Sequence, residues 1–253
     1  MENSKIGWTD HTWNPWKACH KVSEGCRHCY IGRVLRRSGV AKPFAGPIRT
    51  KPATWNNPRK WNRKAKIAGS VNKVFTCSLS DFFHPEADDW RPAAWEVIRS
   101  CDALDWLILT KRPEMIKDRL TENWGTGYPN VWLGVTVELQ KNMKRIQTLS
   151  KIPARVRFVS AEPLLGPVSF GKAIAKLDWI ITGCEQAHRE KRTAMNPKWV
   201  RSIRDECDAA GVPLFHKQYY RGNQIVTDGL IEGVIRQSYP QSCNANLLSC
   251  YGK

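Results

Sequence analysis

The sequence lacks several features that would assign it to a familiar class. No apolar run approaches the ~18 residues of a membrane span, and the first residues, Met1 to Lys5, do not open the apolar stretch of a secretory signal. The sequence also has no P-loop, no GxSxG nucleophile elbow and no HExxH zinc motif, so kinase, hydrolase and metalloprotease functions have no support. We therefore expect a cytoplasmic protein that does not cross a membrane.

Acidic residues are absent between Gly25 and Ser80, although the whole chain has 23 of them and a formal net charge of +17. Basic side chains in such a stretch release counterions from a phosphate backbone, and interleaved aromatic rings can stack on unpaired bases. We expect a nucleic-acid partner; a merely solubilising basic face or a small anionic substrate are the alternatives. The predicted contacts are Arg33, Arg36, Arg37, Arg49, Lys51, Trp55, Arg59, Lys60, Trp61, Arg63 and Lys64.

A repeated pattern of a short apolar run followed by a helix-like segment begins after residue 70. The runs start at Val74, Trp106, Val131, Val156, Trp179 and Pro213, spacings that suit consecutive βα units. The runs are continuous instead of alternating, which indicates strands buried on both faces of a parallel sheet. Helices are predicted at 30–37, 92–100, 113–120 and 197–210, three of them with proline near the start and the last ending at Gly211.

With a further strand near Thr12 to Asn14, the chain has about seven βα units. The predicted fold is α/β, a TIM-type parallel βα barrel that is possibly partial with six to seven units; a doubly wound sheet is the alternative. We expect the barrel to span residues 1–220, with a basic insertion at about 40–72, and residues 221–253 to form a C-terminal extension that contains Cys243 and Cys250.

Polar residues follow nearly every predicted strand, and the active sites of such barrels lie at the carboxyl ends of the strands. For Lys111 and Lys217 the alternative to ligand binding is an ion pair with a neighbouring strand-end glutamate. The strand-end groups are Ser78, Ser80 and Asp81, Thr110 and Lys111, Thr136 and Glu138, Ser160 and Glu162, Cys184 and Glu185, and His216 and Lys217.

Three of the nine cysteines, Cys19, Cys26 and Cys29, lie within eleven residues of one another, just after the first predicted strand. Thiolates are the ligands of iron–sulfur clusters and of zinc. A triplet on one loop favours a [4Fe–4S] cluster whose fourth iron stays open. Two alternatives remain, a structural zinc completed by His11, His20 or His28 and a set of buried cysteines that bind no metal.

This layout resembles the radical S-adenosylmethionine superfamily, in which three cysteines after the first barrel strand hold a [4Fe–4S] cluster. The resemblance implies that the open iron binds S-adenosylmethionine, that a flavodoxin or ferredoxin supplies electrons, and that a 5′-deoxyadenosyl radical forms. The six-residue gap between Cys19 and Cys26 departs from the usual three residues. Cofactor contacts are expected from His28, Tyr30, Ser78, Ser80, Asp81, Thr110, Lys111, Thr136, Glu138, Glu162 and Lys217.

Five further segments resemble a phage and bacterial three-cysteine family of unknown function, in order over residues 4–220. One departure is the 182–186 segment, where the family carries a glycine-rich GGES stretch. Glu162 and Pro163 are similar to the GGEP motif of radical enzymes but follow the fifth repeated strand instead of the second. The segments are Trp8 to Trp16, Ser78 to His84, Leu109 to Pro113, Val131 to Glu138 and Phe158 to Gly166.

More distantly, the arrangement resembles spore photoproduct lyase, a radical enzyme of DNA repair in which an additional cysteine returns a hydrogen atom to the base. That resemblance implies a lyase or base-modifying activity, favours DNA over RNA, and makes Cys77 and Cys184 candidate catalytic thiols. A target base in a duplex would have to be flipped out. The alternatives are a radical enzyme with a small-molecule or protein substrate and a non-catalytic nucleic-acid-binding protein with structural zinc.

Overall fold

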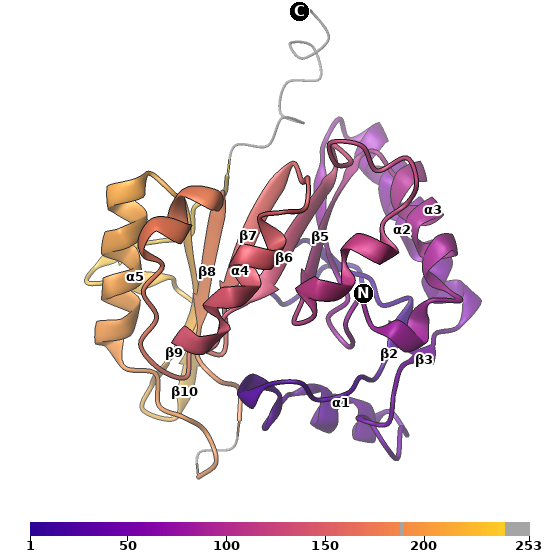
Figure 1. Cartoon of the computed structure of the whole chain (residues 1–253). Coiled ribbons are helices and arrows are strands. Elements are labelled where there is room, and N and C mark those ends of the chain that lie inside the picture. The colour runs from indigo at the N-terminus through magenta and orange to yellow at the C-terminus, as the bar shows by residue number, and fades with distance from the viewer. Residues whose placement is uncertain (188–189, 241–253) are drawn as a thin grey trace, which may run out of the picture.

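The computed structural model describes residues 1–187 and 190–240, and its centre is one curled, mostly parallel sheet of eight strands (Figure 1). Within the described chain, β1 and β10 (Gln224–Val226) form the two edges, so the sheet is an open half-barrel and not a closed TIM barrel. The parallel strands follow one another in chain order, which excludes a doubly wound sheet because the strand order there reverses. They are β1 (His11–Thr12), β4 (Asn72–Thr76), β5 (Leu104–Thr110), β6 (Val131–Thr136), β7 (Val156–Ala161), β8 (Trp179–Gly183) and β9 (Leu214–Arg221).

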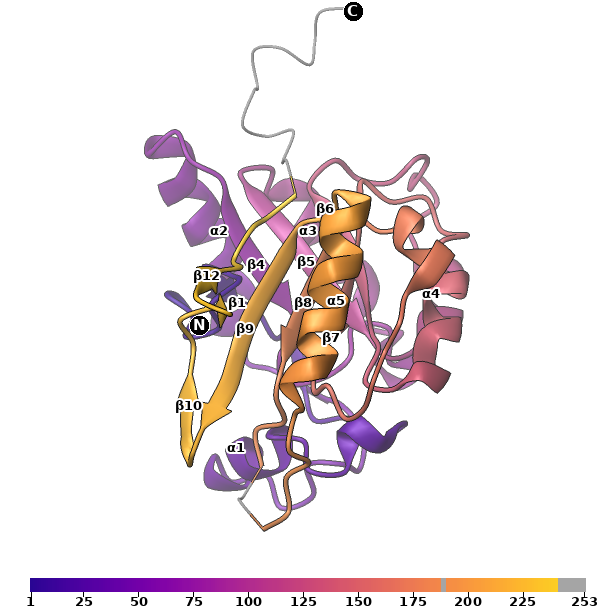
Figure 2. The same ribbon diagram turned by 90° about the vertical axis from the view of Figure 1, so that its left-hand side faces the viewer.

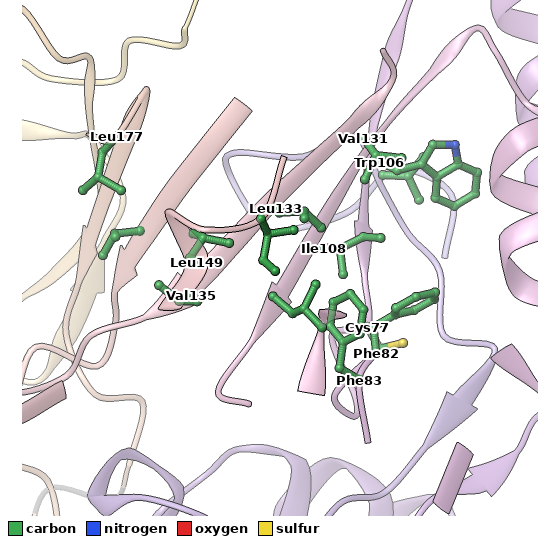
Figure 3. Close-up of a cluster of buried hydrophobic side chains, with 14 of the residues drawn as sticks. Cys77, Phe82, Phe83, Trp106, Ile108, Val131, Leu133, Val135, Leu149 and Leu177 are labelled. Atoms are coloured by element: carbon green, nitrogen blue, oxygen red, sulfur yellow. The ribbon is translucent and has the colours of Figure 1, made fainter. Parts of the chain in front are cut away.

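Helices α2 to α5 cover the outer face of the sheet, and the short helix α1 lies apart from them (Figures 1 and 2). A continuous apolar cluster fills the space between the outer helices and the strands, and Figure 3 shows part of it. No helix in residues 1–187 or 190–240 combines the length and apolarity needed to span a membrane. The helices are α1 (Ile31–Arg37), α2 (Pro52–Ile67), α3 (Arg91–Ser100), α4 (Lys144–Leu149) and α5 (Pro197–Ala210).

The predicted helices at 92–100 and 197–210 are confirmed as α3 and α5. The side chain of Asn196 caps α5 by accepting a hydrogen bond from the Lys198 N–H, and Gly211 ends the helix in the left-handed conformation with φ of 67°. The predicted helix at 113–120 is wrong. That segment forms two short 3-10 turns, and the carbonyl of Arg119 accepts a hydrogen bond from the indole N–H of Trp95.

The basic stretch at 40–72, predicted as an insertion, contains regular secondary structure. It contains β3 (Ile48–Arg49), which pairs with β2 (Trp16–Lys17), and α2, which connects the first parallel strand to the second. One side of α2 is buried in the core. This stretch is therefore part of the crossover of the first βα unit, and the basic residues of α2 lie on the exposed side of that helix.

Large aromatic side chains plug the inner face of the half-barrel. Trp132, Phe158 and Trp179 pack there with Trp8, which precedes β1. Gly134 provides the room, because a Cβ at this position would lie 2.4 Å from the ring of Phe158. Trp8 and Phe75 of this cluster also border the cavity at the carboxyl ends of the strands.

Residues after β9 continue to pack on the sheet, so the predicted boundary at 220 falls at the end of a strand. β10 pairs with β9 (Figure 2), and the indole N–H of Trp179 donates to the Ser238 carbonyl across 2.8 Å. A small hairpin of β11 (Leu230–Ile231) and β12 (Val234–Ile235) follows β10. Cys243 and Cys250 lie outside the described residues.

Candidate functional site

A cavity of about 350 Å³ lies at the carboxyl ends of the parallel strands and is closed on one side by the loop that carries the three cysteines. Polar groups line it next to the loop, and Trp8, Phe75 and Leu109 form its apolar floor. Glu138 is the one predicted cofactor residue outside the lining, and it pairs with Lys111, which is part of the lining. The predicted site residues that line the cavity are Cys19, Cys26, His28, Cys29, Tyr30, Cys77, Ser78, Ser80, Asp81, Thr110, Lys111, Thr136, Glu162, Cys184 and Lys217.

The three loop cysteines are free thiols, and their spacing in space indicates which metal group they suit. A single zinc ion at ~2.3 Å from each sulfur would bring the sulfurs to about 3.8 Å from one another. Among the described residues only His20, His84 and Glu86 bring three potential ligand atoms within 4.8 Å of one another, so the three sulfurs are more widely spread. The three sulfurs are therefore not arranged as the ligands of a single zinc ion.

The histidines that could complete a zinc site have other partners. His11 stacks on Trp61, and His28 lies 3.3 Å from a carboxylate oxygen of Glu185. His20 lies 3.0 Å from a carboxylate oxygen of Glu86. The three thiols therefore form a set of their own on the cavity wall.

His84 does not turn the neighbouring group of His20 and Glu86 into a metal site. Its Nδ1 accepts a hydrogen bond from the backbone N–H of Glu86, so the neutral ring carries its proton on Nε2. Burial and then the nearby Arg112 lower the pKa of His84 to about 4, which keeps the ring neutral at pH 7. The ring acts as the N-terminal cap of a short turn.

Glu138 anchors the cysteine loop from the end of β6. The hydroxyl of Ser23 donates to one carboxylate oxygen across 2.6 Å, and Lys111 lies 3.1 Å from the same oxygen. Arg145 binds the other oxygen at 2.6 Å. Burial alone would raise the pKa of Glu138, but these two cations outweigh it and hold the pKa below its usual range. Gly25 packs directly on this carboxylate.

Arg112 holds the other end of the loop. Its Nη1 lies 3.7 Å from the sulfur of Cys19 and 3.1 Å from a carboxylate oxygen of Asp81, and its Nη2 donates to the His20 carbonyl across 3.1 Å. Asp81 is buried and also accepts hydrogen bonds from the Thr110 hydroxyl and from the backbone N–H groups of Phe83 and Lys111. Asp81 and Thr110 thus support the loop although both were predicted as cofactor contacts.

The sequence analysis missed Arg112, Ser23 and Arg145 as parts of the site. Arg112 lies one residue beyond the strand-end pair of Thr110 and Lys111, and a basic residue between that pair and a proline was the available signal. Nothing in the sequence near Ser23 indicates its bond to a strand 115 residues away.

Two ion pairs predicted as the alternative to ligand binding are present. Lys111 pairs with Glu138, and Lys217 pairs with Glu162 at the cavity wall. Each lysine keeps part of its side chain on the cavity surface. The hydroxyl of Tyr30 donates to the Ser78 carbonyl, and this hydrogen bond joins two residues of the cavity wall.

The two candidate catalytic thiols differ in their surroundings. Cys77 belongs to the apolar cluster between the strands and the outer helices, close to Phe82 and Phe83 (Figure 3). It also borders the cavity. Cys184 lies at the end of β8 and lines both this cavity and a second one beneath α5. Burial raises the pKa of Cys184 to about 12 and that of Cys77 well above its usual value, so both are thiols at neutral pH.

The predicted nucleic-acid contacts divide into two groups. The nine Lys and Arg residues of that set are exposed, and those of α1 directly follow cavity-lining residues Tyr30 and Ile31. Trp55 and Trp61 are buried, against Trp13 and His11 respectively. The prediction that these two rings stack on bases is wrong for this conformation, because the rings pack α2 onto the core.

The comparisons with known proteins give a family. A family model described as "Protein of unknown function (DUF5131)" matches residues 3–234. No curated protein matches the chain. Among solved structures, a cysteine-to-serine mutant of spore photoproduct lyase is similar at 12% identity and a TM-score of 0.48, over 88% of this chain and 68% of that one.

A second structure of spore photoproduct lyase, with bound AdoMet and dinucleoside spore photoproduct, has 11% identity and a TM-score of 0.48. A third, with dinucleoside spore photoproduct, has 10% identity and a TM-score of 0.49; both cover the same shares of the two chains as the first. Likenesses at this level carry no argument about activity, and the case for a function has to come from the residues of the cavity.

Proposed function

The chain belongs to the DUF5131 family, whose description assigns no activity, and we propose that it is a radical S-adenosylmethionine enzyme that acts on a nucleic-acid base. One observation carries the proposal. Cys19, Cys26 and Cys29 converge on a single cavity with the polar ends of six parallel strands, at the edge of the sheet where βα enzymes bind substrate. A [4Fe–4S] cluster there would supply the electron that cleaves S-adenosylmethionine into methionine and a 5′-deoxyadenosyl radical.

In this proposal the residues of the chain hold the cluster, orient the cofactor and shield the radical from water. The thiolates of Cys19, Cys26 and Cys29 would hold a [4Fe–4S] cluster, which would bind and reduce the cofactor. His28, Lys111, Thr136, Glu162 and Lys217 line the wall with donors and acceptors that can orient the cofactor. The apolar floor and the anchored cysteine loop keep water from a reactive radical.

We propose Cys184, with Cys77 as the alternative, as the thiol that returns a hydrogen atom to a substrate radical. Their raised pKa values keep the S–H bond intact at neutral pH, which hydrogen-atom transfer requires. In a single-turnover reaction in D2O, the exchanged thiol would pass deuterium to the product. Cys184→Ala abolishes this deuterium transfer under the proposal, whereas Cys207→Ala, on the buried side of α5, leaves it unchanged.

The substrate class is proposed from the charge around the cavity. The exposed arginines of α1 follow directly on the cavity wall, where they can hold phosphates while a flipped base enters. DNA is the favoured substrate, and a flavodoxin or ferredoxin is the proposed electron donor.

Formation of 5′-deoxyadenosine tests the activity. After anaerobic reconstitution with iron and sulfide, we expect the chain to form it from S-adenosylmethionine with dithionite or flavodoxin, and Cys26→Ala to form none. A wild-type protein that holds the cluster but never cleaves the cofactor, with or without oligonucleotides, would contradict the proposal. Cleavage that oligonucleotides do not affect would favour a small-molecule or protein substrate.

A further inference from the structure

The cluster ligand Cys19 has a cationic neighbour of its own. The guanidinium of Arg112 lies 3.7 Å from the Cys19 sulfur, and Arg112 is buried, as is its partner Asp81. The sulfur of Cys26 lies 3.8 Å from the neutral hydroxyl of Ser23, and the positive charges that act on the Cys29 thiol include Lys111. The three thiols of the loop are thus in unequal electrostatic surroundings.

Several hydrogen bonds hold Arg112 and Asp81 in place beside Cys19. Nη2 of Arg112 is tied to the His20 carbonyl, and its backbone N–H donates to the Thr110 hydroxyl. Both oxygens of Asp81 are occupied by hydrogen bonds. Two buried charges with all their partners in place keep one geometry, so the guanidinium stays directed at the sulfur.

Reduction of a cluster adds one negative charge that spreads over its sulfur ligands. Hydrogen bonds to those sulfurs and nearby charges are among the factors that set the potential of an iron–sulfur cluster. A buried guanidinium stabilises the added charge, and a buried carboxylate opposes it, more strongly than either would in water.

We infer that Arg112 is a positioning residue that fixes Cys19 and raises the reduction potential of a cluster bound there, and that Asp81 acts on the potential in the opposite direction. This inference rests on the proposed function, because it needs a cluster at the three cysteines. It gives a role to a basic residue that is buried beside the loop and whose guanidinium lies against the Cys19 sulfur.

The test is a redox titration of the reconstituted full-length protein, followed by electron paramagnetic resonance, together with its iron content. For Arg112→Gln we expect reduction to become at least tenfold less favourable, which is a shift of about 59 mV to more negative potential for one electron. Asp81→Asn shifts the potential the other way. Arg157→Gln removes a positive charge at the amino end of β7 and leaves the potential unchanged.

Arg112→Lys distinguishes the effect of the positive charge on the reduction potential from that of the guanidinium geometry. Lysine keeps the charge but lacks the planar guanidinium with its several donors. We expect a smaller negative shift than for Arg112→Gln, and this variant is decisive where the glutamine variant fails to hold iron. Shifts of the same sign in Arg112→Gln and Asp81→Asn, or full iron content with no shift in either, would overturn the inference. A wild-type chain that holds no cluster would instead refute the proposed function, and this inference would fall with it.

Discussion

The hydroxyl of Ser23 lies 2.6 Å from a carboxylate oxygen of Glu138, and this bond ties the cysteine loop to the end of β6. Lys111 and Arg145 hold the same fully buried carboxylate. One side chain therefore joins the loop that carries the thiols to the strand ends that face them.

Glu138→Ala tests that anchor. The substitution leaves Lys111 and Arg145 without their shared anion, and breaking a buried pair from one side costs about 3–5 kcal/mol. We expect the free energy of unfolding in urea at pH 7 to fall by that amount. Glu96→Ala removes an exposed carboxylate paired with Arg99 and serves as the control, with a change of about 0.5 kcal/mol or less. An equal, small effect of both variants would contradict the anchoring role.

Gly25→Ala probes the contact between loop and anchor. A Cβ at Gly25 would lie 2.6 Å from a carboxylate oxygen of Glu138, so the loop has to move away from β6. The matched control is Gly7→Ala, whose Cβ would meet Phe215 at an ordinary 3.7 Å. We expect Gly25→Ala to be cleaved faster in the loop by limited proteolysis and to retain less iron after reconstitution. Retention equal to that of Gly7→Ala would show that the loop does not depend on this contact.

The sequence predicts the sheet well because its signals are local. Continuous apolar runs such as those of β5 and β6 indicate buried strands, and six of them in chain order leave few topologies. Whether the sheet closes depends on packing at its edges, which no local pattern records. The basic composition of α2 masks its narrow apolar side, so the sequence does not show that this helix packs on the core.

The candidate site divides in the same way. Cys19, Cys26 and Cys29 are found from the sequence because ligands of one kind lie on one loop. The contact between Arg112 and Cys19 joins residues 93 positions apart, and only the fold brings them together. Aromatic residues in a basic stretch can either stack on bases or pack in a core, and the sequence does not distinguish the two. Trp55 and Trp61 are buried, which shows that they pack in the core.

The arginines of α1 provide a test of the nucleic-acid surface. For Arg33→Gln, Arg36→Gln and Arg37→Gln combined, we expect weaker oligonucleotide binding and a slope of log K against log salt reduced by about two to three, since each phosphate contact contributes 0.7–0.9. The control replaces Lys172, Lys176 and Lys198, exposed residues outside the basic stretch, with glutamine. Equal losses in the two triple variants would mean that net charge, and not this surface, governs binding.

His216 gives a predictable dependence of stability on pH. Burial lowers the pKa of His216 to about 4, from an ordinary value of 6.5. Between these values the unfolded chain binds a proton that the folded chain does not, so stability is lost as the pH falls, by about 2 kcal/mol at pH 5. The hydrogen-bonding neighbour of the ring is Thr182.

The matched variant for this effect is His216→Asn, which cannot titrate. We expect the wild type to be more stable than the variant at pH 7 and this advantage to shrink by about 2 kcal/mol at pH 5, as measured by urea unfolding. A difference that stays constant with pH would show that the ring does not titrate in this range.

The most direct test of the account is the metal content of anaerobically purified and reconstituted protein, with an electron paramagnetic resonance spectrum of the reduced state before and after addition of S-adenosylmethionine. The account predicts about four irons and four sulfides per chain, the composition of a [4Fe–4S] cluster. It further predicts a signal that the cofactor alters and the loss of both iron and signal in Cys26→Ala, with Cys207→Ala unaffected. One zinc and no iron per chain, or a cluster that survives Cys26→Ala, would contradict it.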